Sequence, residues 1–376
     1  MNRASADSQT IWPIIVAWGK GYAPGREQRQ KLYQWALYGD QNTDQDEQKE
    51  VWLLSTQEVD TVLTQRAELL QKLVQHLDNR YFELPLSGDW TDWVEPLWRL
   101  WIPLAQRIDK QQRALGQPFV QGVVGGQGTG KTTLSRVLRP LLKCLGHHCL
   151  TLSIDDLYLS YAARCQLCEQ DARLIWRGPP GTHDVALGMA TLAQIKSATA
   201  ETTVSLPRFD KSLHQGQGDR TSPLLFNGPT VLIFEGWFVG AQPLADDVFT
   251  AKDFVFPPPI VTPADRQFAI DCNARLREYL PLWDFLDSLI VLKPQDYKLS
   301  LQWRQQAEQA MIATGKSGLS DDDIASFVTY FWKALHPQLF IEPLTQSEKT
   351  SLVVNIDQNH CLGELSVPLC GHSASR

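Results

Sequence analysis

The sequence of 376 residues has few cysteines, no long apolar run and no excess of basic side chains. No stretch approaches the roughly 20 apolar residues that span a bilayer. The 35 lysines and arginines are outnumbered by 42 acidic residues, and this balance argues against a general nucleic-acid binder. The seven cysteines are thinly scattered, and the one C-x-x-C pair, Cys165 and Cys168, lacks the second pair that a zinc site needs. We therefore expect a globular, cytoplasmic protein with no membrane or nucleic-acid partner, while its oligomeric state stays open.

The first part of the chain, residues 1–115, is rich in tryptophan. Two stretches in it have apolar residues at helical spacing: residues 55–81, which open with the capping-box pair Ser55 and Glu58, and residues 92–116. We predict a helical N-terminal region packed through its aromatic side chains. A partner surface or an oligomer interface is the alternative interpretation. Eight of the 13 tryptophans lie here: Trp12, Trp18, Trp35, Trp52, Trp90, Trp93, Trp98 and Trp101.

The second part, residues 116–376, alternates short apolar runs with helical and glycine-rich stretches. Near-continuous apolar runs are typical of strands that helices cover on both faces. The alternation predicts an α/β domain with a mostly parallel sheet flanked by helices and right-handed crossovers. The expected strands are residues 119–124, 149–154, 230–235, 288–293 and 351–356.

A glycine-rich stretch, GVVGGQGTGKTTLSRVL at residues 122–138, contains the pattern G-x-x-x-x-G-K-[ST]. An expected strand precedes the pattern and a helical stretch follows it, which is the setting that makes the match credible. Glycines let backbone N–H groups surround phosphates, Lys131 can reach the β- and γ-phosphates, and the Thr132 hydroxyl can bind Mg²⁺. The pattern therefore predicts that the α/β domain is of the P-loop NTPase type. The predicted nucleotide site is formed by Gly125, Gly126, Gln127, Gly128, Thr129, Gly130, Lys131, Thr132 and Thr133.

Carboxylates stand at the ends of two expected strands. Asp155 and Asp156 follow residues 149–154, and Glu235 ends residues 230–235. In open α/β sheets the site lies at the carboxyl ends of the strands, so these side chains are expected to face the γ-phosphate. They suit the organisation of Mg²⁺, together with Thr132, and the deprotonation of an attacking hydroxyl. One aspartate is expected to cap the next helix, and we assign that role to Asp156 rather than Asp155.

Five stretches follow the glycine-rich loop in a fixed order: LSIDDLY, GPPGTHD, LPRFDKS…GQGDR, FEGWFVG and WRQQAE. Together with the loop they resemble the D-glycerate 3-kinase family of plants and cyanobacteria. That family lies within a wider group that includes uridine kinase, phosphoribulokinase and bacterial pantothenate kinase. The resemblance covers roughly residues 117–357. It implies an ATP- and Mg²⁺-dependent kinase that converts D-glycerate to 3-phosphoglycerate.

The same resemblance implies roles for individual residues. It places the catalytic aspartate of the group at Asp155 and its magnesium- or water-ordering acidic residue at Glu235. It also implies an acceptor-binding insert over about residues 157–229, with substrate loops at Arg177–Asp184 and Arg208–Arg220.

A lid is implied over about residues 298–318. Lys131 is expected to neutralise phosphate charge from the nucleotide loop. In the lid, Arg304 is expected either to stabilise the transferring phosphoryl group or to be an ordinary exposed arginine.

The substrate loops favour an anionic acceptor, because an arginine can pair with a carboxylate through two parallel hydrogen bonds. We expect three cations of the second loop to orient the carboxylate and at least one of them to form only a surface ion pair. His183, Asp184 and Asp210 are expected to bind hydroxyl groups. The candidate substrate-binding residues are Arg177, His183, Asp184, Arg208, Asp210, Lys211 and Arg220.

Two alternatives remain at this point. The acceptor could be uridine, pantothenate or ribulose 5-phosphate, phosphorylated by the same chemistry. The nucleotide site could instead belong to a regulatory module, in which the tryptophan-rich region binds a partner. Only the family resemblance favours the 3-hydroxyl of glycerate over the 2-hydroxyl.

Overall fold

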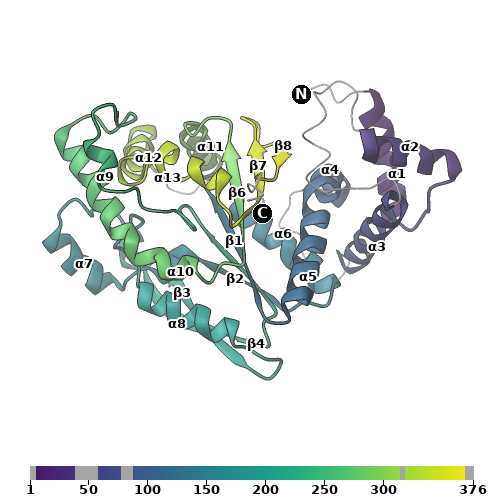
Figure 1. Ribbon diagram of the computed structural model, residues 1–376, viewed down its shortest axis with the longest axis horizontal. Coiled ribbons are helices and arrows are strands. Elements are labelled where there is room, and N and C mark those ends of the chain that lie inside the picture. Colours follow the sequence, from purple (N-terminus) through teal and green to yellow (C-terminus); the bar gives the residue numbers. More distant parts are fainter. Residues whose placement is uncertain (1–5, 39–57, 78–87, 314–317, 369–376) are drawn as a thin grey trace, which may run out of the picture. The chain divides into compact units, whose positions relative to one another are not determined.

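The computed structural model describes residues 6–38, 58–77, 88–313 and 318–368 (Figure 1). Two compact units can be distinguished. The first draws on the described parts of residues 1–116, 132–149 and 364–367, and the second on those of residues 117–131, 150–363 and 368–376. Among the described helices, none is both long enough and apolar enough to cross a membrane.

The N-terminal region is helical, as predicted. Its helices are α1 (Ala6–Gly19), α2 (Arg26–Tyr38), α3 (Val59–Leu77), α4 (Val94–Pro96) and α5 (Ile102–Leu115). The expected cap at Ser55 lies outside the described residues.

The second predicted helix of this region is interrupted. A 3₁₀ turn at Trp90–Trp93 precedes α4, and a π-helical turn at Leu97–Trp101 separates α4 from α5. Tryptophans do pack inside this unit: Trp98 is fully buried, and its ring centroid lies 6.4 Å from that of Trp18.

The central sheet has six strands in the order β2-β5-β1-β6-β7-β8. β1 pairs in parallel with β5 and β6, and β6 pairs in parallel with β7. All five expected strands are present, and β8 was not predicted. The strands are β1 (Phe119–Gly125), β2 (Cys149–Ser153), β5 (Val231–Gly236), β6 (Ser288–Pro294), β7 (Thr350–Ile356) and β8 (Leu362–Ser366).

A separate two-stranded sheet corrects the prediction of a loop over residues 208–220. β3 (Thr203–Asp210) and β4 (Asp219–Asn227) form an antiparallel hairpin, in which Phe209 pairs with Arg220. Exposed and buried residues alternate at the start of β3, which is the period of a half-buried strand. Only residues 211–218 form the connecting turn.

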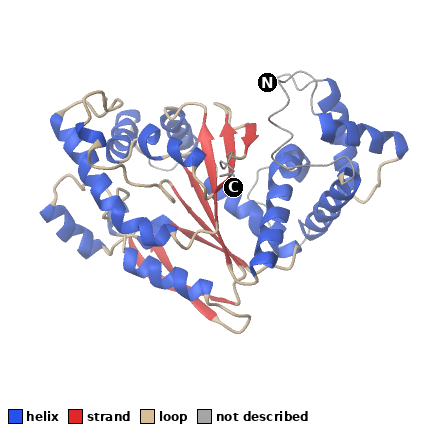
Figure 2. Ribbon diagram, in the orientation of Figure 1, coloured by secondary structure: helices blue, strands red, loops and turns tan. Residues whose placement is uncertain are grey.

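Helices lie beside the strands (Figure 2). α8, α9 and α10 contribute Leu192, Phe268 and Leu282 to one apolar cluster, which also contains Val120 and Leu232 of the central strands. Burying such a side chain contributes about 1.5–3 kcal/mol, so this cluster holds the strand ends in fixed positions. The remaining helices are α6 (Lys131–Cys144), α7 (Tyr161–Gln170), α8 (Val185–Lys196), α9 (Pro263–Leu276), α10 (Leu280–Trp283), α11 (Leu299–Ala313), α12 (Asp321–Ala334) and α13 (Pro337–Phe340).

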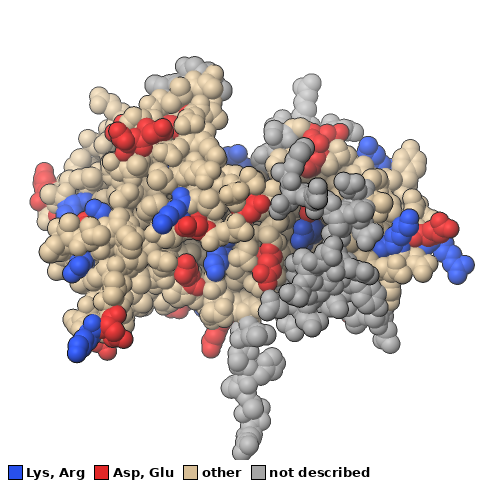
Figure 3. Space-filling view, turned by 90° about the horizontal axis from the view of Figure 1, so that it is seen from above, with Lys and Arg blue, Asp and Glu red and all other residues tan. Residues whose placement is uncertain are grey.

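The surface carries charges of both signs. On the face shown in Figure 3, basic side chains of the described residues stand singly or near acidic ones. The described residues on this face form no continuous basic surface of the kind that is typical of nucleic-acid binders.

Candidate functional site

The glycine-rich loop joins β1 to α6 and is shaped for close approach of a ligand to its backbone. Gly128 and Gly130 have φ values of +78° and +86°, a region that residues with a side chain rarely adopt. The Nζ of Lys131 donates a hydrogen bond to the Gly126 carbonyl at 2.9 Å, and so does the Thr129 hydroxyl. The lysine is thus held against the loop itself, at a carbonyl that phosphate oxygens can replace.

Thr132 and Thr133 are the second and third residues of α6, immediately after Lys131. The loop and the helix start follow a parallel strand, as the motif requires.

Two carboxylates lie near this lysine. The β1–β5 register pairs Glu235 with Val123, two residues before Gly125 begins the loop. Asp155 lies in the short 3₁₀ turn that follows β2. Burial lowers the pKa of Lys131, and the negative charges of Glu235 and Asp155 oppose that shift. Burial raises the pKa of Glu235, while the Lys131 charge acts in the other direction. The three groups therefore form one electrostatically coupled cluster.

Asp155 has partners on both of its carboxylate oxygens. The Nζ of Lys211 lies 2.6 Å from Oδ2, and the Tyr158 hydroxyl donates to Oδ1 at 2.8 Å. Burial opposes ionisation of this carboxyl, but the Lys211 charge and the two hydrogen bonds outweigh it and hold its pKa below the ordinary value. Asp155 is therefore ionised at neutral pH and able to accept a proton.

The adjacent Asp156 has a different role, the capping role assigned to it from the sequence. It forms a capping box with Ser153, whose backbone N–H donates to Oδ2 at 3.1 Å. Arg208 also donates to Oδ2, at 3.0 Å, and the Phe209 N–H donates to Oδ1 at 3.3 Å. Arg208 further donates to the Thr151 carbonyl. Asp156 and Arg208 thus fasten the β3–β4 hairpin to the end of β2.

A second ion pair braces the other side of the hairpin. Arg220 donates to Oδ2 of Asp184 at 2.9 Å and to the Tyr158 carbonyl at 2.8 Å. Asp184 also caps α8 through the Leu187 N–H. Asp210 accepts hydrogen bonds from the backbone and the hydroxyl of Ser212 within the turn. Each of the three cations expected to orient a carboxylate therefore already has an acidic partner: Arg208, Lys211 and Arg220.

His183 is a buried, neutral imidazole beside this cluster. Its ring stacks on Tyr158 with centroids 4.6 Å apart, and burial lowers its pKa to about 3. Nδ1 lies 2.8 Å from the Tyr279 hydroxyl, which already accepts a hydrogen bond from the Gly181 N–H. Either group can supply the proton of this hydrogen bond, because a hydroxyl has two acceptor lone pairs as well as its own proton. Nε2 is buried and has no hydrogen-bond partner among the described residues.

Two arginines hold the turn of the hairpin by its carbonyl groups. Arg177 donates through Nη1 to Gly216 at 2.8 Å and to Gln217 at 3.0 Å. Arg164, from α7, donates through Nη2 to Gln217 at 2.7 Å and to Gly218 at 2.6 Å. Sequence reasoning missed Arg164 and Tyr279, because neither lies in a motif.

The predicted lid contains α11. Arg304 pairs with Glu308 one turn further along, at 2.9 Å, and the buried Glu308 also accepts from the Leu319 N–H. Trp303 is buried and its ring stacks on that of His360. A Cβ added to Gly128 would lie 2.8 Å from the Cβ of Trp303. The tryptophan of WRQQAE thus packs against the glycine-rich loop.

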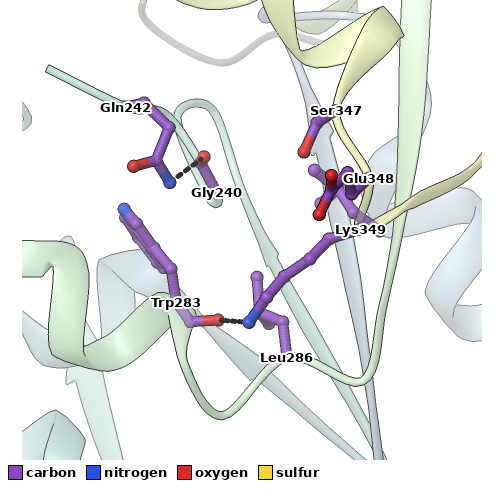
Figure 4. A pocket seen from close by; sticks show the side chains of 8 residues that line it. Gly240, Gln242, Trp283, Leu286, Ser347, Glu348 and Lys349 are labelled. Carbon is purple, nitrogen blue, oxygen red and sulfur yellow. Dashed lines mark hydrogen bonds between the residues drawn. The ribbon is translucent and has the colours of Figure 1, made fainter. Parts of the chain in front are cut away.

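Two cavities among the described residues differ in their distance from the glycine-rich loop. One, of about 250 Å³, lies where Leu286 precedes β6 and Lys349 precedes β7, at the amino ends of these strands (Figure 4). Lys349 donates to the Trp283 carbonyl there, and no predicted site residue lines the cavity. The other, of about 50 Å³, is apolar and is lined by Gly126 and Gln127 of the loop. Only the second cavity adjoins the phosphate-binding elements.

The described residues contain no group of three or more His, Cys, Asp or Glu side chains arranged to hold a metal by themselves. Mg²⁺ in phosphoryl-transfer sites takes one or two carboxylates and completes its shell with phosphate oxygens and water. The coupled pair Asp155 and Glu235, next to Lys131, fits an ion that arrives with a nucleotide.

A parallel sheet with a glycine-rich loop after its first strand, and carboxylates at the neighbouring strand ends, defines the fold of a P-loop kinase. Comparison with known proteins supports this class.

The chloroplastic D-glycerate 3-kinase of Arabidopsis thaliana is 34% identical over an alignment of 254 residues, and the match covers 64% of this chain and 53% of that protein. The chain thus spans about half the length of that relative. An uncharacterised kinase of Schizosaccharomyces pombe is 31% identical over 68% of this chain and 90% of its own.

Among solved structures, D-glycerate 3-kinase from Cryptococcus neoformans superposes with a TM-score of 0.62 at 28% identity. The match covers 71% of this chain and 97% of that one. No protein-family model matches the sequence. The chain belongs to the family of P-loop kinases that these relatives represent.

Proposed function

We propose that this protein transfers the γ-phosphoryl group of ATP to the 3-hydroxyl of D-glycerate and forms 3-phosphoglycerate. The observation that carries the proposal is the ionised Asp155, held between Lys211 and Tyr158 at the end of β2 and coupled to Lys131 of the phosphate loop. Similarity to two D-glycerate 3-kinases supports the choice of acceptor.

The nucleotide is expected to bind along residues 125–133. Lys131 would exchange the Gly126 carbonyl for phosphate oxygens, because a charged acceptor binds an ammonium group more strongly than a neutral carbonyl does. Thr132, Asp155 and Glu235 would hold Mg²⁺ when it enters with ATP. The ion would neutralise charge on the β- and γ-phosphates.

Asp155 is proposed to be the general base. Its low pKa keeps it ionised, so it can accept the proton of the acceptor hydroxyl as the phosphoryl group is transferred. Lys211 occupies one of its oxygens and is largely exposed, with 61% of its side chain accessible. The lysine is therefore free to swing toward the incoming phosphoryl group when the hydroxyl takes its place.

The acceptor would lie between the β3–β4 turn and the strand ends. The Nε2 of His183 has no hydrogen-bond partner among the described residues, so it is suited to form a hydrogen bond with a hydroxyl group of the acceptor. Arg208, Arg220 and Asp184 would keep the pocket in shape through their ion pairs. Arg304 would reach the phosphoryl group only after leaving Glu308.

A panel of acceptors with coupled detection of ADP tests the proposal. We expect rapid ADP release with D-glycerate, and slow release with uridine, pantothenate and ribulose 5-phosphate. Activity with one of these and none with D-glycerate would refute the choice of acceptor. Tight binding of ATP without transfer to any of them would refute the kinase activity.

A further inference from the structure

We propose that Arg177, held in position by Arg164, receives the carboxylate of the acceptor. This inference rests on the proposed function and assigns the anionic end of its substrate. The sequence favoured Arg208, Lys211 and Arg220 for this role, whereas the geometry favours Arg177.

The cations around the pocket differ in whether they form ion pairs. Arg208, Lys211 and Arg220 lie 3.0, 2.6 and 2.9 Å from carboxylate oxygens. Among the described residues, Arg177 and Arg164 form no ion pair and donate only to backbone carbonyls. Burial and the neighbouring Arg177 charge lower the pKa of Arg164, and the charge of Asp219 acts in the other direction. Two adjacent positive charges, neither of which forms an ion pair within the described part of the chain, are a favourable place for an anion.

Arg177 uses only part of its guanidinium group for hydrogen bonds. Its hydrogen bonds to Gly216 and Gln217 use Nη1 alone. Nε and Nη2 make no hydrogen bond within the described part of the chain. These two N–H groups form one edge of the guanidinium plane, the edge that binds both oxygens of a carboxylate in parallel. Arg177 is also only partly buried, so a ligand can reach this edge.

Arg177 lies beside Tyr158, the residue that also contacts the proposed base Asp155. The guanidinium carbon of Arg177 lies 5.9 Å from the ring centroid of Tyr158 and 5.6 Å from that of Phe209. The hydroxyl at the far end of the Tyr158 side chain is bonded to Asp155. The base and the guanidinium therefore both lie beside the Tyr158 side chain. A three-carbon acid with C–C bonds of about 1.5 Å extends about 5 Å from its terminal hydroxyl to its carboxylate, so one such molecule can lie along this side chain.

Arg164 holds the backbone of the β3–β4 turn in place. Its guanidinium donates to the carbonyls of Leu159, Gln217 and Gly218, and it lies 5.1 Å from the Phe209 ring. Gln217 is also a partner of Arg177, so Arg164 fixes the backbone against which Arg177 rests. Arg164 is therefore a positioning residue.

The test compares an acid with its neutral analogue. Arg177→Met is assayed with D-glycerate and with glyceramide, in which an amide replaces the carboxylate. We expect the KM for D-glycerate to rise about 30- to 100-fold, the value of a charge-assisted pair, and the kcat/KM for glyceramide to change by less than about threefold. Arg177→Lys should recover part of the loss, because it keeps the charge and loses the fork. The matched control is Arg266→Met, since Arg266 lies over the Phe256 ring, outside the site.

The outcomes separate the inference from the proposed function. Equal losses with the acid and the amide, or an unchanged KM for D-glycerate, would overturn the role of Arg177 while the wild-type activity with D-glycerate stands. A wild-type enzyme that prefers another carboxylic acid, and loses that preference in Arg177→Met, would overturn only the choice of D-glycerate. A wild-type enzyme that prefers a neutral acceptor would overturn both.

Discussion

The adjacent aspartates of the SIDDLY motif give a sharp prediction, because Asp155 is the proposed base while Asp156 holds the β3–β4 hairpin through Arg208 and Phe209. Asp155→Asn removes the proposed base and keeps the size of the side chain. General-base contributions are about 10²- to 10⁴-fold, so we expect kcat to fall by that factor. The KM for ATP should change little, since the glycine-rich loop is untouched. The melting temperature should also stay near that of the wild type.

Asp156→Asn is the matched control. The change weakens acceptance of hydrogen bonds from Ser153, Arg208 and Phe209 and leaves a partly buried arginine without its counterion. Losing such a partner costs about 1–3 kcal/mol. For a domain of this size, that lowers Tm by about 3–10 °C. The kcat of the protein that remains folded should stay within about threefold of the wild type.

The assay pairs steady-state ADP release with thermal unfolding for both variants. The reasoning is refuted if Asp156→Asn loses turnover as severely as Asp155→Asn while its Tm stays unchanged, because the two roles would then be reversed. It is also refuted if Asp155→Asn keeps the wild-type kcat.

Three further predictions follow from individual contacts. Lys211→Met removes the charge that keeps the Asp155 pKa low, so that pKa rises and the acidic limb of the kcat/KM profile moves to higher pH; an unmoved limb would contradict the pairing. Tyr279→Phe removes the hydroxyl that holds the His183 ring through Nδ1, so the KM for D-glycerate should rise about 3- to 10-fold with no change in the KM for ATP. Parallel increases in both constants would indicate a general structural defect instead. Gly128→Ala places a Cβ 2.8 Å from Trp303 at a positive φ, so ATP affinity, measured by titration, should fall at least about tenfold. Wild-type affinity in that variant would mean that the loop does not need this conformation.

Features carried by local pattern could be predicted from the sequence. The central strands have near-continuous apolar runs, and the glycine-rich loop has a spacing that few other structures share. The capping role of Asp156 was also predictable, because a cap depends on residues three apart in the chain. These signals fixed the fold and the donor side of the site.

The acceptor side depends on contacts between distant segments. Nothing local in the sequence says that Arg208 meets Asp156, or that Arg220 meets Asp184, although these pairs decide which cations remain for a ligand. Tyr279 reaches His183 from a turn 96 residues further along the chain. The hairpin was read as a loop because its glycines and charges masked the alternation of exposed and buried residues in β3.

The central claim is tested most directly by NMR identification of the product formed from D-glycerate and ATP. The proposed function predicts 3-phosphoglycerate, formed in equal amount to ADP and almost absent from reactions of Asp155→Asn at the same enzyme concentration. Formation of 2-phosphoglycerate, or release of ADP with no phosphorylated glycerate, would contradict it.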